Sequence, residues 1–211
     1  MSNVLTTIPL NDGTRTSASF LQIGAKKTGK TQSTLNIMAD MIRRRGVPIL
    51  IFDNALQAEY EVFLPILIGE IPHWDQIWPH ARLPVFRCRT RDALLFFEYV
   101  YEYVRNSLVV FEDCTNYLTG NMPMVMKDVI LQCKNHGNDL VFNTHSIRSA
   151  APFVLEQCEY YILRQTPDDP YRLPAKVPHP HRVREAMLEI MEENEGKELK
   201  LAYRLLKTQE L

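Results

Sequence analysis

Short apolar runs alternate with longer amphipathic segments along most of the chain. Strands are predicted for the apolar runs at 20–23, 47–52, 83–88, 107–111, 139–142 and 160–163. Helices are predicted between them, at 31–45, 92–104, 124–136 and 150–157. The run 47–52 is apolar throughout, as in a strand buried on both faces of a parallel sheet. This alternation predicts an α/β fold with a three-layer, mostly parallel sheet.

The two ends of the chain and one internal segment depart from this pattern. Residues 61–83 hold several prolines and both tryptophans, which predicts an irregular insertion or short helices on the surface. Five prolines between 165 and 181 predict an extended arm. Charged helices are expected at about 182–194 and 197–209. The predicted organisation is an N-terminal arm or edge strand (1–18), a core domain (19–165), and a proline-rich arm with C-terminal helices (166–211).

A glycine-rich loop joins the first predicted strand to the first predicted helix. Gly24 to Thr31 fit the P-loop pattern G-x-x-x-x-G-K-[ST]. Such a loop binds phosphates through backbone N–H groups and the N-terminus of the helix. Lys30 would contact the β- and γ-phosphates of ATP, and the Thr31 hydroxyl would bind Mg²⁺. The predicted nucleotide-binding residues are Gly24, Ala25, Lys26, Lys27, Thr28, Gly29, Lys30, Thr31 and Gln32.

An acidic pair, Glu112-Asp113, follows the predicted strand 107–111. Its position fits a Walker B motif, in which one carboxylate holds Mg²⁺, partly through water, and its neighbour polarises the attacking water. Glu112 would take the metal position and Asp113 the base position. Most P-loop relatives have Asp before Glu, and here the order is reversed, so the base is shorter. The alternative is an acidic pair that only closes the strand onto a loop.

Polar residues also end the predicted strand 139–142. Asn143, Thr144 or His145 would contact the γ-phosphate or its water, as a sensor does, although His145 fits a merely structural role equally well. Additional strands with a catalytic carboxylate favour the RecA/AAA-like division of P-loop proteins. A guanine-reading Asn-Lys-x-Asp motif is missing, which counts against a GTPase. The predicted catalytic residues are Lys30, Glu112, Asp113, Asn143 and Thr144.

Composition adds limits on location and partners. The chain has 211 residues and a net charge of −1, with no run of five like charges that would indicate a broad nucleic-acid-binding tail. Four scattered cysteines predict buried thiols in a reducing compartment. The sequence contains neither a signal peptide nor an apolar stretch long enough to span a membrane. A cytoplasmic protein without a membrane segment is expected.

Three stretches resemble the HerA/FtsK-type ATPases. Asp53 followed by Glu59-Tyr60 resembles the "strand, Asp, then Glu-Tyr" feature of that group. The runs 108–117 and 140–146 resemble small viral and mobile-element members, among them genome-packaging ATPases of tailless viruses and Zot-like phage assembly ATPases. The resemblance covers about 19–165.

The resemblance implies a hexameric or pentameric ring that uses ATP to move double-stranded DNA and package a viral genome. Asp53 and Glu59 would be acidic residues at the strand end, and 115–123 is a candidate pore loop. Capsid or portal-vertex proteins are further candidate partners, in the host cytoplasm or at the packaging vertex of the virion. An arginine finger would reach the next subunit's site. Its candidates are Arg87, Arg89, Arg91 and Arg148, each of which could instead form an ordinary surface salt bridge.

Other functions stay open at this point. One is a Zot-like phage assembly, export or conjugation ATPase. Another is a small-molecule P-loop kinase, in which Arg87, Arg89 and Arg91 would belong to a lid. A third is a nucleotide-binding regulatory or assembly protein with little turnover. Stimulation of ATP hydrolysis by duplex DNA, together with ring formation, would separate the motor from the others.

Overall fold

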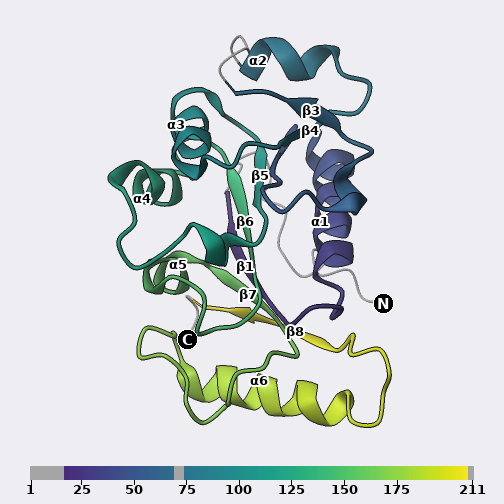
Figure 1. Cartoon of the computed structure of the whole chain (residues 1–211), viewed down its shortest axis with the longest axis vertical. Helices are drawn as coiled ribbons and strands as arrows, with labels where there is room; N and C mark the ends of the chain where they lie inside the picture. Colours follow the sequence, from purple (N-terminus) through teal and green to yellow (C-terminus); the bar gives the residue numbers. More distant parts are fainter. Residues whose placement is uncertain (1–16, 69–73, 209–211) are drawn as a thin grey trace.

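One mixed sheet organises the chain in the computed structural model, which describes residues 17–68 and 74–208. Within them, eight strands follow the order β3-β4-β2-β5-β6-β1-β7-β8 (Figure 1). The β7–β8 pair is antiparallel and the other neighbours are parallel. The strands are β1 (Ser19–Ile23), β2 (Ile49–Phe52), β3 (Leu64–Ile66), β4 (Val85–Cys88), β5 (Leu108–Phe111), β6 (Asp139–Thr144), β7 (Tyr160–Arg164) and β8 (Tyr203–Lys207).

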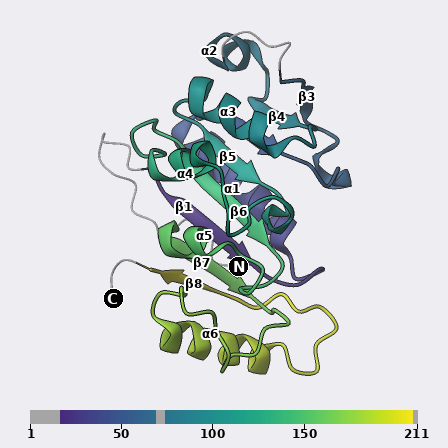
Figure 2. The same cartoon turned by 60° about the vertical axis from the view of Figure 1, so that its left-hand side comes forward.

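Helices cover both faces of this sheet, which confirms the predicted α/β class. The α-helices are α1 (Lys30–Arg45), α2 (Trp74–Ile77), α3 (Ala93–Tyr103), α4 (Met124–Leu131), α5 (Pro152–Gln157) and α6 (Pro180–Glu193). Buried side chains of α3, α4, α5 and α6 share one core with the sheet face that includes Leu21 and Phe111. Ile37, Met38 and Met41 of α1 form the core on the opposite face. Figure 2 shows α1 behind the sheet and α3, α4 and α5 in front.

Strand β6 lies between β1, which leads into the glycine-rich loop, and β5, which leads into the acidic pair. Val141 of β6 is in register with Phe20 of β1 and with Val110 of β5. This additional strand is the arrangement expected for the RecA/AAA-like division. It also brings three polar strand ends to one edge of the sheet, where open α/β sheets bind ligands.

The predicted second C-terminal helix at 197–209 is wrong. Its central part forms β8 instead, antiparallel to β7. Tyr203 and Leu205 pack towards the core of α1, whereas Leu206 packs towards the core of α3–α6. This alternation satisfies both faces of a strand, which outweighs the helical preference of the leucines and lysines. The sheet therefore crosses the predicted boundary at 165, and the domain division remains a prediction.

Other differences are local. Within 61–83, Trp74–Ile77 form the short helix α2, in line with the prediction of short helices, whereas the edge strand Leu64–Ile66 beside β4 was not predicted. The helix predicted at 124–136 ends at Leu131. The predicted arm at 1–18 lies outside the described residues apart from Ser17 and Ala18, which are buried.

The cysteines are buried, as predicted. All four cysteines are buried and free. In the described parts of the chain, no helix is both long and apolar enough to cross a membrane.

Candidate nucleotide-binding site

The glycine-rich loop forms the floor of a cleft at the carboxyl edge of the sheet. Hydrogen bonds from outside hold its first residues: Gly24 N donates to Thr144 O over 3.2 Å, and Ala25 N donates to Gln165 O over 2.8 Å. Thr28 Oγ1 closes the loop on Ala25 O over 2.8 Å. The carboxyl ends of β6 and β7, the two neighbours of β1, thus hold the start of the loop in place.

Both glycines of the motif are required by their surroundings. A Cβ at Gly24 would lie 2.7 Å from Thr28 Oγ1 and 2.8 Å from Arg164 Cβ, too close for either atom. Gly29 has φ 87°, a left-handed conformation that side chains rarely adopt, and it precedes the first residue of α1. The helix therefore begins with its free N–H groups directed into the loop, as phosphate binding requires.

Arg164 at the end of β7 supports this loop from below. Its Nη1 donates to Thr28 O over 2.8 Å and to Leu201 O over 3.3 Å. The guanidinium carbon lies 5.1 Å from the centre of the Tyr203 ring. Arg164 thus links the loop to the C-terminal strand, and sequence reasoning missed it because its partners are far away along the chain.

Lys30 is folded back onto the loop. Its Nζ donates to Gly24 O, and to Ala25 O over 3.0 Å, and lies 3.4 Å from His145 Nδ1. Burial lowers the pKa of Lys30 to about 8, even though the carboxylates of Glu112 and Asp113 oppose the shift. A phosphate in the loop would replace these carbonyl contacts with a full negative charge.

Glu112 directly follows β5 and is a buried carboxylate with three hydrogen-bond donors. Asn143 Nδ2 donates to its Oε1 over 2.6 Å, Tyr60 Oη donates to the same oxygen, and Gln57 Nε2 donates to Oε2 over 3.0 Å. Only 3% of the residue is exposed, and burial raises the pKa of Glu112 in spite of these hydrogen bonds. A buried carboxylate next to a Thr hydroxyl and a phosphate cradle is a suitable place for a divalent cation.

Asn143 connects that carboxylate to the two elements beside it. Its Oδ1 accepts from Gln22 Nε2 of β1 over 2.6 Å, and its Nδ2 also donates to Thr34 Oγ1 of α1 over 3.1 Å. Asn143 is 1% exposed. The residue predicted as a sensor therefore holds Glu112 in this structure. Thr144, a second candidate sensor, forms hydrogen bonds with Ser146 O and Ser149 Oγ.

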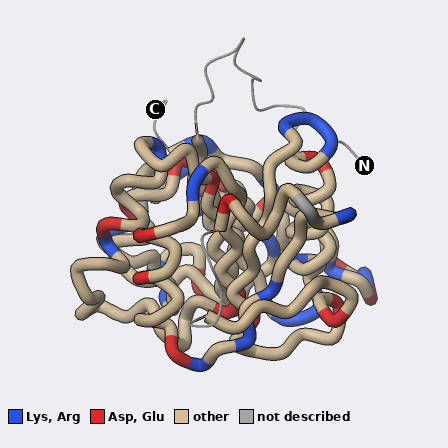
Figure 3. The backbone as a smooth tube through the Cα atoms, turned by 90° about the horizontal axis from the view of Figure 1, so that it is seen from above, with Lys and Arg blue, Asp and Glu red and all other residues tan. Residues whose placement is uncertain are grey.

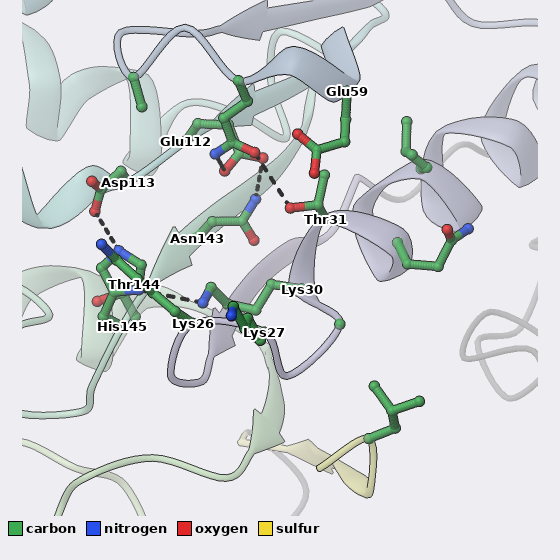
Figure 4. A pocket seen from close by; sticks show the side chains of 16 residues that line it. Lys26, Lys27, Lys30, Thr31, Glu59, Glu112, Asp113, Asn143, Thr144 and His145 are labelled. Atoms are coloured by element: carbon green, nitrogen blue, oxygen red, sulfur yellow. Dashed lines mark hydrogen bonds and ion pairs between the residues drawn. The ribbon is translucent and has the colours of Figure 1, made fainter. Parts of the chain in front are cut away.

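Asp113 and His145 form a pair beside Lys30 (Figure 4). His145 Nε2 lies 3.2 Å from Asp113 Oδ1. Burial and the charge of Lys30 lower the pKa of His145, so the neutral ring can donate from Nε2 to Asp113 and accept at Nδ1 from Lys30. Asp113 has φ 44°, and its carboxylate also accepts from Thr115 and Asn116. The candidate base is partly exposed and already oriented.

Together these residues line a cleft of about 570 Å³. Figure 4 shows Lys26, Lys27 and Lys30 on one side of it and Glu59, Glu112 and Asp113 across from them. The lining residues that were predicted from the sequence are Lys26, Lys27, Gly29, Lys30, Thr31, Gln32, Glu59, Glu112, Asp113, Asn143, Thr144 and His145. Gly24, Ala25 and Thr28 contribute the loop behind them. Sequence reasoning missed Leu35, Ala55, Gln57 and Leu201, which carry no motif.

The oxygen donors fit a metal that arrives with the nucleotide. No group of three or more His, Cys, Asp or Glu residues within 17–68 and 74–208 could hold a metal ion by itself. Mg²⁺ is usually bound by one or two protein oxygens, with substrate phosphates and water completing its shell. Thr31 and Glu112 meet that requirement.

Two predicted residues pair away from the cleft. Asp53 is fully buried, and its Oδ2 lies 3.7 Å from Arg87 Nη1, whose residue is 7% exposed. Arg87 is therefore engaged within its own chain, which removes it from a kinase-type lid. Arg89, Arg91 and Arg148 are exposed and lie outside the cleft lining.

Figure 3 shows basic and acidic residues interspersed along the described backbone.

Comparison with known proteins identifies the fold. No family model and no curated protein sequence matches the chain. The genome packaging NTPase B204 of Sulfolobus turreted icosahedral virus 2, solved in complex with AMP, matches with a TM-score of 0.61 and 14% identity over 91% of this chain and 93% of that one. The chain has the fold of B204.

Two further structures support this assignment. The ATP-gammaS complex of B204 from the same virus gives a TM-score of 0.59 and 13% identity, covering 92% of this chain and 93% of that one. B204, the DNA-packaging ATPase of Sulfolobus Turreted Icosahedral Virus, gives 0.60 and 12%, covering 92% and 98%. The resemblance to viral packaging ATPases is thus confirmed at the level of the fold.

Proposed function

We propose that this protein is an ATPase that powers the movement of double-stranded DNA, as in the packaging of a viral genome. The supporting observation is the cleft itself, in which the phosphate-binding loop with Lys30 and Thr31 faces the Glu112-Asp113 pair. The fold that carries this cleft is shared along nearly the whole chain with a DNA-packaging ATPase.

Each group has a chemical role in this proposal. The loop N–H groups and Lys30 bind the phosphates, and Thr31 with Glu112 holds Mg²⁺, which neutralises charge on the phosphates. Asp113 accepts a proton from the attacking water, and His145 orients its carboxylate over 3.2 Å. Asn143 and Tyr60 keep the buried Glu112 carboxylate in place.

The assembly part of the proposal is a ring of identical subunits around DNA. Hydrolysis in P-loop motors depends on an arginine finger from a neighbour, which stabilises charge on the transferred phosphoryl group. Arg89, Arg91 and Arg148 remain the candidates because their side chains are exposed. The segment 115–123, directly after the acidic pair, remains the candidate DNA-contacting loop. The proposed sites of action are the host cytoplasm and the packaging vertex, with capsid or portal-vertex proteins as partners.

The test is steady-state ATP hydrolysis with and without duplex DNA, combined with the molecular mass in solution in the presence of ATP. The proposal expects a ring and faster hydrolysis when duplex DNA is added, and it expects Lys30→Ala to abolish hydrolysis. A protein that stays monomeric with ATP, and whose turnover DNA does not change, would overturn the motor while leaving the nucleotide site intact.

A further inference from the structure

The side chain of Gln57 lies between the two residues proposed to bind Mg²⁺. Thr31 Oγ1 donates to Gln57 Oε1 over 3.3 Å, and Gln57 Nε2 donates to Glu112 Oε2 over 3.0 Å. One amide thus bridges a residue of α1 to a residue at the end of β5. Gln57 lines the same cleft and belongs to neither sequence motif.

The turn before Gln57 is built to hold it there. Its backbone N–H donates to Asp53 Oδ1 over 2.9 Å, and Asp53 is fully buried beside Arg87. Leu56, the preceding residue, has φ 54°, a conformation that leucine rarely adopts, and its side chain is 44% exposed. Backbone strain of this kind clusters at functional sites.

We propose that Gln57 is a third protein side chain of the Mg²⁺ site, beside Thr31 and Glu112. This inference rests on the proposed function. The amide oxygen of Gln57 is a hard ligand that could bind Mg²⁺ directly or accept a hydrogen bond from Mg²⁺-bound water. The amide N–H of Gln57 orients the Glu112 carboxylate. Asp53 acts through Gln57 as a positioning residue, which explains why a buried carboxylate follows β2.

The experiment measures Mn²⁺ binding by electron paramagnetic resonance in the presence of AMPPCP, a nucleotide that is not hydrolysed. Gln57→Ala should weaken the Mn²⁺ affinity about tenfold, the usual effect of losing a residue that supports a metal site. Binding of AMPPCP without divalent metal should not change. Gln76→Ala, the same substitution at an exposed position of α2, is the matched control and should match the wild type.

A second variant separates an oxygen donor from a purely structural bridge. Gln57→Glu keeps an oxygen at this position and removes the N–H that holds Glu112, so it should retain Mn²⁺ affinity if the oxygen serves the metal. Unchanged or tighter Mn²⁺ binding in Gln57→Ala would overturn the inference, and tighter binding would show that Gln57 obstructs the site. Loss of affinity in both variants would reduce Gln57 to a structural bridge and would also overturn it. Failure of the wild type to bind AMPPCP with Mn²⁺ would instead overturn the proposed function, and the inference with it.

Discussion

Asn143 at the end of β6 donates a 2.6 Å hydrogen bond from its side-chain amide to the buried carboxylate of Glu112 at the end of β5. The oxygen of the same Asn143 amide accepts a hydrogen bond from the side chain of Gln22 in β1 over 2.6 Å. Three neighbouring strands are therefore joined by polar side chains at the edge of the sheet that carries the cleft. The position of the proposed metal ligand depends on this connection.

Asn143→Ala should lower the free energy of unfolding of the nucleotide-free protein by about 2 kcal/mol, because it removes one hydrogen-bond partner each from the buried side chains of Glu112 and Gln22. Urea denaturation measures the change. Asn36→Ala, at an exposed position of α1, is the control and should stay within about 0.5 kcal/mol of the wild type. Equal effects of the two substitutions would contradict the role given to Asn143.

ATP binding should weaken at alkaline pH. The pKa of Lys30 is lowered to about 8 in the free protein, and bound phosphate favours the protonated lysine. Above that pKa, binding must take up a proton, so the dissociation constant of ATP should rise by up to about tenfold per pH unit. Isothermal titration calorimetry in buffers of different ionisation enthalpy measures both the affinity and the proton uptake.

Lys30→Arg provides the control for this pH dependence. Arginine keeps its charge throughout the range, so any residual ATP binding should not change with pH through loss of that charge. If the wild-type affinity for ATP stayed constant above pH 8 and binding took up no proton, Lys30 would already be protonated in the free protein. That result would contradict its lowered pKa of about 8.

Arg164→Ala tests the support beneath the glycine-rich loop. The substitution removes the donor to Thr28 O and Leu201 O, so stability should fall by about 1–3 kcal/mol and ATP should bind more weakly. Arg204→Ala on the neighbouring strand removes ion pairs with Glu189 and Glu193, which lie on the surface. That control should cost at most about 1 kcal/mol and leave ATP affinity unchanged.

Local motifs in the sequence predicted much of this site, because each lies on consecutive residues. The loop from Gly24 to Thr31 and the pair Glu112-Asp113 each follow an apolar strand, and parallel strands place their carboxyl ends together. Contacts between distant segments were not predictable in the same way. Arg164 meets Thr28 across 136 positions of the chain.

Gln57 and β8 illustrate the remaining gap. The role of Gln57 depends on a turn shaped by a buried ion pair and by the left-handed conformation of Leu56, which no local pattern indicates. The β8 segment contains residues that suit a helix, and its strand conformation comes from pairing with β7 and from α6 beside it. Tertiary contacts, which a local sequence pattern does not reveal, therefore decided both cases.

Asp113→Asn should stop hydrolysis while keeping ATP binding. Asparagine tolerates the left-handed conformation of this position, φ 44°, so the variant should fold like the wild type. Loss of the proton acceptor should reduce turnover about 10²–10⁴-fold. Asp75→Asn, exposed on α2, should have wild-type turnover in the same assay. Full activity of Asp113→Asn would transfer the role of base to another residue.

Displacement of a third DNA strand from a duplex measures movement along DNA directly. The proposed motor should strip the third strand when ATP is supplied. It should leave the strand in place with AMPPCP, and with the Lys30→Ala or Asp113→Asn variant in ATP. ATP hydrolysis by the wild type on the same duplex, without displacement of the third strand, would contradict the claim that this site drives DNA movement.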